Sequence, residues 1–185
     1  MTEIDYTISK EELIDFHMGH VEETKVFKYQ MISNFIFIIL VILLGFLVAI
    51  ALIKDPLSIV IYIVFSFIIM LFRKKIIMHK LRKKFFKIYS FDKYQNLFEQ
   101  TKLTFVEEGL KVNTKFVVKI YNWNSIKSIH SVDNYILVRT VNNEDLLIPI
   151  FSFKPIENKQ IFLDTIINNT NLELEKEYPK DIKYL

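Results

Sequence analysis

The sequence predicts a membrane α-helical hairpin followed by a small α+β cytoplasmic domain. Two long uncharged runs, a basic cluster directly after them, and a change from helical to strand periodicity predict this fold class. A chain of 185 residues allows one membrane unit and one small globular domain, and it leaves no room for a large catalytic fold. Cysteine is absent, which excludes disulfides and thiolate chemistry and fits a cytosolic location of the soluble part.

The segment 1–30 is expected to form a short strand and an amphipathic helix. Ile4, Tyr6 and Ile8 alternate with polar residues, as in a strand. Ser9 and Glu12 form a capping box, which predicts a helix from Lys10 to about Tyr29. Gly19 is a weak point in that helix. The expected semi-apolar face consists of Leu13, Phe16, His20, Thr24 and Phe27.

The segment 34–72 is predicted to be a two-helix transmembrane hairpin. Residues 34–53 are twenty residues without a charge and span about 30 Å as a helix, the thickness of a hydrocarbon core. Lys54-Asp55-Pro56 interrupts the uncharged sequence, and a second uncharged run covers residues 57–72. The second span can extend through Arg73, Lys74 and Lys75, because their long side chains can place the charges at the membrane interface. Buried core helices of a soluble protein are the alternative, which the basic cluster disfavours.

Eight basic residues follow the second run, with no acidic residue among positions 73 to 87. We predict that they bind the membrane surface: Arg73, Lys74, Lys75, Lys80, Arg82, Lys83, Lys84 and Lys87. Without them the chain holds 16 basic residues against 21 acidic ones, so the basic character is local and no nucleic-acid partner is expected. Such flanks lie in the cytoplasm, which predicts a multi-pass protein with both termini cytoplasmic.

The basic juxtamembrane helix is expected over residues 73–98. Its apolar stripe lies opposite the basic face and consists of Ile76, Ile77, Leu81, Phe85 and Ile88. This pattern predicts a helix that leaves the membrane and lies along an anionic surface. An ordinary solvated charged helix is the alternative interpretation.

Residues 102–170 are expected to form a sheet-plus-helix domain. Short β-branched and aromatic segments, separated by predicted turns at Asp133-Asn134 and at 142–145, predict an antiparallel meander of about five strands. Gly109 follows Glu107-Glu108 in a turn, where glycine can take positive φ. Pro149 marks an edge or the end of a strand. A covering helix follows Pro155, and the charged tail 171–185 is expected to be loose at its end.

No catalytic residue, metal site or cofactor is predicted. His17, His20 and Glu23 are spaced like metal ligands on one helical face, but no third convincing ligand lies nearby. His79 and His130 have no nucleophile or carboxylate partner at a recognisable spacing. Phosphate-binding and dinucleotide motifs are absent, and neither span carries a charge. These observations disfavour an enzyme or an ion channel.

Several motifs resemble the YcxB-like membrane protein family. Trp123-x-x-Ile126-x-x-Ile129, an aromatic strand at Asn134–Leu137, and Ile148-Pro149-x-x-x-Phe153 occur in the order of its C-terminal domain. The entry strand Phe105-x-x-x-Gly109 and the earlier Phe16-x-x-x-His20 are also similar. The usual basic residue after Ile-Pro is replaced by Ile150-Phe151. The motif positions, which we interpret as structural, are Phe16, His20, Gly109, Trp123, Ile126, Pro149 and Phe153.

The resemblance implies a pleckstrin-homology-like antiparallel sheet with a C-terminal helix, in a bacterial membrane protein without a settled activity. We expect Trp123 to fill the core, with its indole N–H bound to one acceptor. Two functions fit. The first is a membrane-tethered regulatory module that engages an unidentified protein or lipid headgroups. The second is an immunity protein against a membrane-active bacteriocin or secreted toxin. The oligomeric state stays open, a homo-oligomer included.

Overall fold

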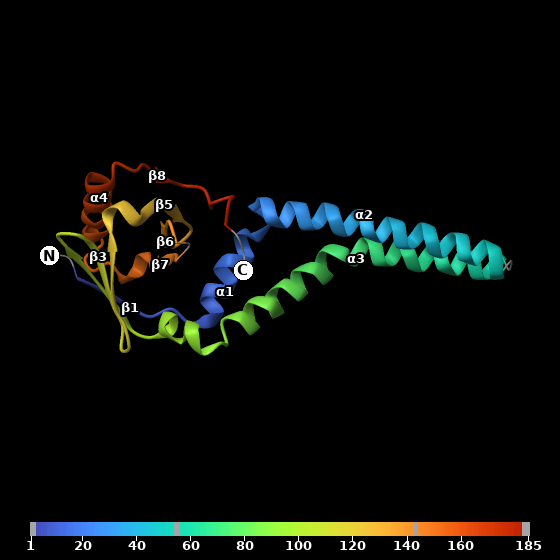
Figure 1. Cartoon of the computed structure of the whole chain (residues 1–185), viewed down its shortest axis with the longest axis horizontal. Helices are drawn as coiled ribbons and strands as arrows, with labels where there is room; N and C mark the ends of the chain where they lie inside the picture. The colour runs from blue at the N-terminus through green and yellow to red at the C-terminus, as the bar shows by residue number, and fades with distance from the viewer. Residues whose placement is uncertain (1–2, 54–55, 143, 183–185) are drawn as a thin grey trace. The chain divides into compact units, whose positions relative to one another are not determined.

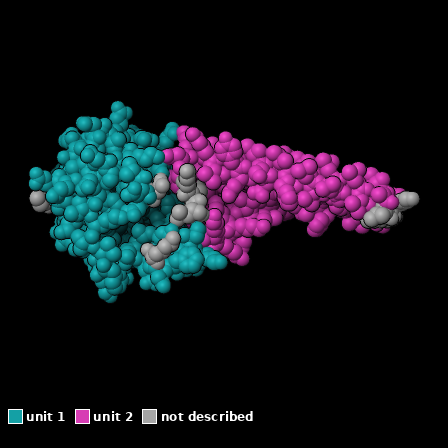
Figure 2. Space-filling model, in the orientation of Figure 1, with its two compact units in different colours: residues 1–17, 86–179 teal, residues 18–85, 180–185 magenta. Residues whose placement is uncertain are grey.

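Two compact units make up the computed structural model, which describes residues 3–53, 56–142 and 144–182 (Figure 1). The first unit combines Met1–His17 with Phe86–Pro179 and carries the strands, and we call it the sheet domain. The second unit combines Met18–Phe85 with Lys180–Leu185 and carries most of the two long helices (Figure 2). We call it the helical unit.

Two long helices dominate the helical unit. α2 (Lys25–Val48) continues directly into the π-helix η2 (Ala49–Ile53), and α3 occupies Pro56–Ile88. Both are long and apolar enough to cross a membrane, and most of their side chains in the uncharged runs are exposed. Apolar surface of this extent requires cover by lipid or protein in the cell. The sequence prediction of two candidate spans is therefore confirmed.

The second long helix does not end with its uncharged run. The run stops at Phe72, yet α3 continues without interruption to Ile88. Neither glycine nor proline occurs between Leu57 and Ile88, and lysine and arginine are good helix formers. The segment 73–98 is thus not a helix of its own. Its first part belongs to α3, and a 3₁₀ helix, η3, follows at Asp92–Phe98.

The N-terminal elements confirm the predicted strand and capping box. β1 covers Ile4–Tyr6, and α1 covers Lys10–His20. The backbone N–H of Ser9 donates to Glu12 Oε2 at 2.7 Å, and the N–H of Glu12 donates to Ser9 Oγ at 3.1 Å. These reciprocal bonds satisfy two backbone donors at the helix start.

The predicted continuation of the first helix to about Tyr29 is wrong. α1 ends at His20, and the 3₁₀ helix η1 (Val21–Glu23) separates it from α2. Thr24 then takes an extended conformation, and its hydroxyl accepts a bond from the N–H of Phe27 at 3.3 Å. Thr24 is therefore the N-cap of α2. The apolar spacing continues across this break, which conceals the boundary in the sequence.

The sheet domain contains two four-stranded sheets, and the predicted single meander of about five strands is wrong. The first sheet consists of β1, β2 (Thr101–Val106), β3 (Gly109–Asn113) and β4 (Val118–Asn122). These strands lie in the order β1-β2-β3-β4, and all neighbours are antiparallel.

The second sheet consists of β5 (Ile126–Val132), β6 (Tyr135–Thr140), β7 (Leu146–Pro149) and β8 (Leu174–Glu175). Its strands lie in the order β7-β6-β5-β8. The sheets are joined by the 3₁₀ helix η4 (Trp123–Ser125), whose Ser125 hydroxyl donates to Asn122 O at 2.7 Å.

Gly109 has a different role from the predicted one. None of the described glycines has positive φ, so Gly109 does not provide a left-handed turn. A Cβ atom at Gly109 would instead lie 2.0 Å from the backbone oxygen of Tyr121. Gly109 is thus required for the close approach of β3 and β4. Asp133 takes the left-handed conformation, with φ 51°, in the predicted turn between β5 and β6.

One hydrophobic core joins the two sheets and α4 (Glu157–Thr170). Phe162 of α4 packs against Phe105 at 5.3 Å and Phe153 at 5.4 Å between ring centroids. β7 ends at Pro149 and is an edge strand, which confirms both predictions for that proline. Asn171 ends α4 in a left-handed conformation.

The C-terminal tail is not loose over the residues that the structure describes. β8 pairs in parallel with β5, and Leu174 lies opposite Ile129. Tyr178 and Ile182 are buried. Leu174, Tyr178 and Ile182 each bury apolar surface, although charged residues surround them in the sequence. The predicted loose end of the tail falls on residues 183–185, which lie outside the described residues.

Candidate functional site

All eight predicted basic residues lie on the C-terminal half of α3. Seven are exposed, and Arg73 is half-buried with its guanidinium 4.4 Å from the centre of the Phe35 ring on α2. Lys74 forms an ion pair with Glu22 at 2.7 Å. The other six basic residues are also exposed on this helix, and no acidic residue occurs among positions 73–87. Such a cluster attracts anionic lipid or an acidic protein surface.

The centre of the predicted apolar stripe of this segment is buried by the protein, and only other parts of the stripe remain open to lipid. Leu81 and Phe85 are 9% and 4% exposed, so both are buried by the protein itself. Ile76 is 45% exposed and lies one turn beyond the last uncharged residues. The basic face of this part of α3 therefore offers charge to a partner, while the centre of the stripe serves packing.

The motif residues of the YcxB-like resemblance have structural positions. Phe16, Ile126, Pro149 and Phe153 are buried, and Gly109 lies at the β3–β4 contact described above. Trp123, expected in the core, is only half-buried beside Phe105. Its indole N–H donates to Glu107 O at 3.0 Å, which confirms the expected single acceptor.

The two N-terminal histidines contact different groups. His17 Nδ1 lies 2.8 Å from the Tyr178 hydroxyl, and the ring stacks on Tyr89 at 6.4 Å between centroids. His20 Nδ1 lies 3.0 Å from Glu23 Oε1. Among the described residues, no group of three or more His, Cys, Asp or Glu side chains could hold a metal ion.

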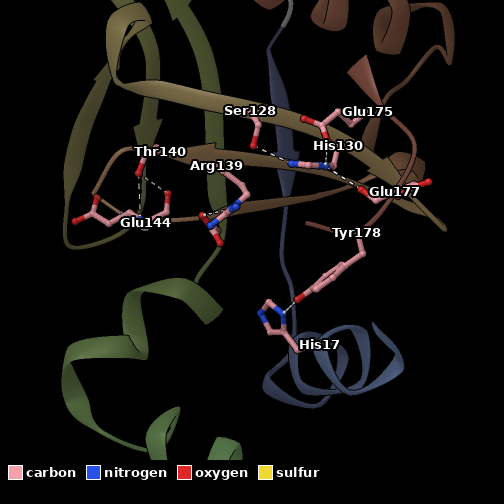
Figure 3. A network of polar contacts seen from close by, with 10 residues as sticks. His17, Ser128, His130, Arg139, Thr140, Glu144, Glu175, Glu177 and Tyr178 are labelled. Atoms are coloured by element: carbon pink, nitrogen blue, oxygen red, sulfur yellow. Dashed lines mark hydrogen bonds and ion pairs between the residues drawn. The ribbon is translucent and has the colours of Figure 1, made fainter. Parts of the chain in front are cut away.

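A buried polar cluster on β5 and β6 was missed from the sequence (Figure 3). Ser128 on β5 lies opposite Arg139 on β6, and His130 lies opposite Leu137. His130 and Arg139 are 1% and 2% exposed. The opposite face of the same strands, with Ile129 and Val138, belongs to the core. Both faces of this sheet are therefore covered, and one of them carries polar side chains.

His130 is held on both sides of its ring. Nε2 lies 2.8 Å from the Ser128 hydroxyl, and Nδ1 lies 2.9 Å from the backbone oxygen of Glu177. The Glu175 carboxylate is 3.5 Å from Nδ1. The expectation that His130 has no serine or carboxylate partner is wrong, because Ser128 lies two residues earlier on the same strand face and Glu175 arrives with β8.

The serine–histidine distance would suit activation of a hydroxyl nucleophile. Yet His130 is 1% exposed, and its other nitrogen is bound to the main chain of the tail. A substrate would reach the ring only after the tail had moved. The contacts instead fix the tail: His130 binds Glu177, and His17 binds Tyr178. The arrangement favours a structural clamp for residues 174–178 over catalysis.

The β6–β7 connection is held by the same cluster. Arg139 Nε lies 3.5 Å from Asp145 Oδ1, both side chains being largely buried. Thr140 Oγ1 donates to Glu144 O at 2.9 Å and accepts from the Glu144 N–H at 3.1 Å. Buried charges stay in proteins when they are paired in this way. The predicted turn at 142–145 falls partly outside the described residues, since Asn143 is among those not described.

A surface cavity of about 610 Å³ lies between α1 and the β5–β6 turn. Its lining is acidic and aromatic, and it consists of Glu12, Asp15, Phe16, Asp133, Asn134 and Tyr135. Burial, and secondarily the charge of Glu12, raises the pKa of Tyr135. The three carboxylates would favour a cation, and no second feature of the cavity specifies a ligand.

Sequence alternation carried the signal for the missed cluster. In β5, Ser128, His130 and Val132 share one face. Once the strand is assigned, the sequence alone predicts that Ser128 and His130 lie next to each other on this face. Tyr178 gave no comparable signal, because its burial depends on contacts with distant residues. No protein-family model, curated protein or solved structure matches the chain.

Proposed function

We propose that the chain is a membrane-tethered binding module without catalytic activity, located at the inner face of a bacterial membrane with both termini in the cytoplasm. The observation that best supports this proposal is the continuity of α3, in which an uncharged half is followed directly by an exposed basic half. The resemblance to YcxB-like proteins supports a small regulatory domain next to this helix. Its partner is the anionic leaflet or an acidic protein surface beside it.

Electrostatics supports this role. Each lysine or arginine close to an anionic leaflet contributes about 1 kcal/mol, and the attraction falls off within about 8 Å at physiological salt. Seven exposed basic residues on one helix exceed what a solvated linker requires. Because Leu81 and Phe85 are buried by the protein, the attraction depends on charge and is sensitive to salt.

The test uses the full-length chain in nanodiscs of neutral or anionic lipid. Limited trypsin cleavage at Lys80, Lys83 and Lys84 should be at least tenfold slower in anionic nanodiscs at low salt, and the protection should vanish at high salt. The variant with all three lysines changed to glutamate should lose in-cell function. A matched variant changes the exposed Lys115, Lys154 and Lys176 to glutamate, with the same change in net charge, and should keep that function.

Equal cleavage on both lipids would contradict binding of the leaflet. If the Lys80, Lys83 and Lys84 reversal also leaves function intact, this part of α3 is only a linker. An isolated peptide is a poor substitute for the full chain, because it would expose Leu81 and Phe85 and bind lipid through them.

The orientation is tested with single cysteines, since the natural chain has none. An impermeant thiol reagent applied to intact cells should label Pro56→Cys, at the start of α3, and should not label Glu11→Cys or Lys176→Cys. Lysis should make the latter two reactive. Labelling of Glu11→Cys or Lys176→Cys in intact cells would overturn the proposed topology.

A further inference from the structure

β4 is an unprotected edge of the first sheet. It pairs with β3, and no other strand among the described residues pairs with its second edge. Val118 and Ile120 are 61% and 46% exposed, and the sheet surface beside them carries Lys111 and Asn113. Natural edge strands are usually short, or carry charged residues, proline or a bulge. β4 has five residues, and its one charged residue, Lys119, is paired with Glu144. Here the other edges are short: β1 has three residues, β8 has two, and β7 has four and ends in Pro149.

The hydrogen-bond pattern shows which backbone groups of β4 face outward. At one end of the β3–β4 ladder the N–H of Thr114 donates to Val117 O at 2.9 Å, and at the other the N–H of Trp123 donates to Glu108 O at 3.1 Å. Hydrogen-bonded and non-bonded pairs alternate in an antiparallel ladder. The outward N–H and C=O groups therefore belong to the alternate residues Val118, Ile120 and Asn122.

We propose that this edge pairs with β4 of a second copy of the chain, antiparallel and around a two-fold axis at Ile120. In this register Ile120 lies opposite Ile120 of the second copy, and Val118 lies opposite its Asn122. All three outward-facing residues then bond to their counterparts, and the Asn122 oxygen accepts this bond in addition to the one from the Ser125 hydroxyl. The two first sheets become one eight-stranded sheet, and the proposal rests on the sheet domain alone.

The number of paired residues selects this register over its neighbours. An axis at Lys119 would place Asn122 opposite Phe116, which lies in the closed turn, and an axis at Tyr121 would place Val118 opposite Asn124 of η4, so each would leave one outward-facing residue of β4 without a strand partner. An axis at Val118 would need the turn residues 114–117 as strand, but that turn is closed by bonds between Thr114 and Val117. With the axis at Ile120, Lys119 lies opposite Tyr121 of the second copy.

The side chains fit this arrangement. Lys119 already lies 5.0 Å from the centre of the Tyr121 ring in its own strand, so a second aromatic face adds a contact of the same kind. Lys119 is also ion-paired with Glu144, which reduces repulsion between the two copies. The basic charge of β4 is thereby balanced within each copy, and an acidic partner is not needed. A second identical strand is the occupant that this edge fits.

Single cysteines in full-length protein test the register, because the natural chain contains none. Opposed residues in a bonded antiparallel pair have Cα atoms about 5.5 Å apart, within the range of a disulfide. Two Val118 residues would lie about 15 Å apart in the same dimer, beyond that range. Oxidation should therefore give at least tenfold more disulfide dimer from Ile120→Cys than from Val118→Cys or from Val141→Cys, which is 57% exposed outside β4.

A second measurement uses the dimer dissociation constant in detergent, by analytical ultracentrifugation. Ile120→Lys should raise it at least tenfold, whereas Val141→Lys should change it less than twofold, with unchanged unfolding temperatures. Equal crosslinking at all three cysteines would show association through the long helices and would overturn the proposal. So would a monomeric wild type, or an Ile120→Cys shielded from thiol reagents by lipid or another protein without dimer formation.

Discussion

The hydroxyl of Tyr62 on α3 occupies the space beside Gly45 on α2. A Cβ atom at Gly45 would lie 2.2 Å from that hydroxyl oxygen, which no normal contact permits. The hydroxyl donates to the backbone oxygen of Ile42 at 2.9 Å. Gly45 therefore permits a polar contact between two apolar helices.

Substitution at this contact should weaken the hairpin. Gly45→Val should destabilise the protein by about 1–3 kcal/mol through overpacking, and Tyr62→Phe by about 0.6–1.5 kcal/mol through loss of the bond. In a protein that already carries Tyr62→Leu, Gly45→Val should reduce the free energy of unfolding much less, because the obstructing ring is absent. Denaturation in mild detergent compares the wild type with these four variants. Equal costs of Gly45→Val in both backgrounds would contradict the contact.

The N-cap of α2 should contribute measurably to stability. Thr24→Ala should cost about 1–2 kcal/mol, because the side chain is fully buried and caps the N–H of Phe27. Thr24→Ser keeps the hydroxyl and should recover most of that loss. Unfolding in detergent gives both values. If the alanine and serine variants were equally stable, the hydroxyl would not be the cap.

The clamp on the tail should depend on His130. His130→Leu leaves Ser128 and the Glu177 carbonyl without this partner and should cost about 2–4 kcal/mol. Trypsin should then cleave faster at Lys176 in the released tail. Tyr178→Phe removes the hydroxyl bond to His17 and should cost about 1 kcal/mol. Unchanged cleavage in the His130 variant would show that the tail is held by other contacts.

Alkaline pH should destabilise the sheet domain through two tyrosines. Burial is the main cause that raises the pKa of Tyr6 and the pKa of Tyr121, from a value of 10.0 in the unfolded chain. The raised pKa means that this stability is fully present below pH 10 and is lost as the pH rises above it, by at most about 1.4 kcal/mol per pH unit for each tyrosine.

The measurement is the unfolding free energy between pH 9 and 11. Tyr6→Phe with Tyr121→Phe should flatten its decline above pH 10, whereas Tyr29→Phe, at a 74% exposed position, should not. An equally steep decline in the double variant would show that other groups cause the alkaline loss.

Local signals predicted the helical hairpin and the N-terminal capping box. Both depend on residues close in sequence: an uncharged length for the spans, and Ser9 with Glu12 for the cap. The end of α1 was missed because the apolar spacing from Phe16 to Phe27 continues through it, and only the Thr24 hydroxyl marks the break.

Long-range pairing limited the prediction of the sheets and of the candidate site. Residues 126–149 read as a continuation of one meander, since a corner at Trp123–Ser125 looks like any turn until the pairing of β5 is known. β8 consists of two residues, and its pairing with Ile129 and His130 has no local signature. The clamp around His130 depends on that pairing. The basic residues of α3 were visible because charge clusters are local.

α3 joins two chemically different runs in one helix. Its 33 residues measure about 50 Å along the helix, with the uncharged run in the first half and the basic residues in the second. Because the helix is continuous from Pro56 to Ile88, each basic side chain keeps a fixed angular position, about 100° per residue, relative to the apolar side chains before it. An extra residue inserted between Phe72 and Arg73 would therefore turn the whole basic segment by about 100° around the helix axis, whereas a substitution at either position would leave that angle unchanged.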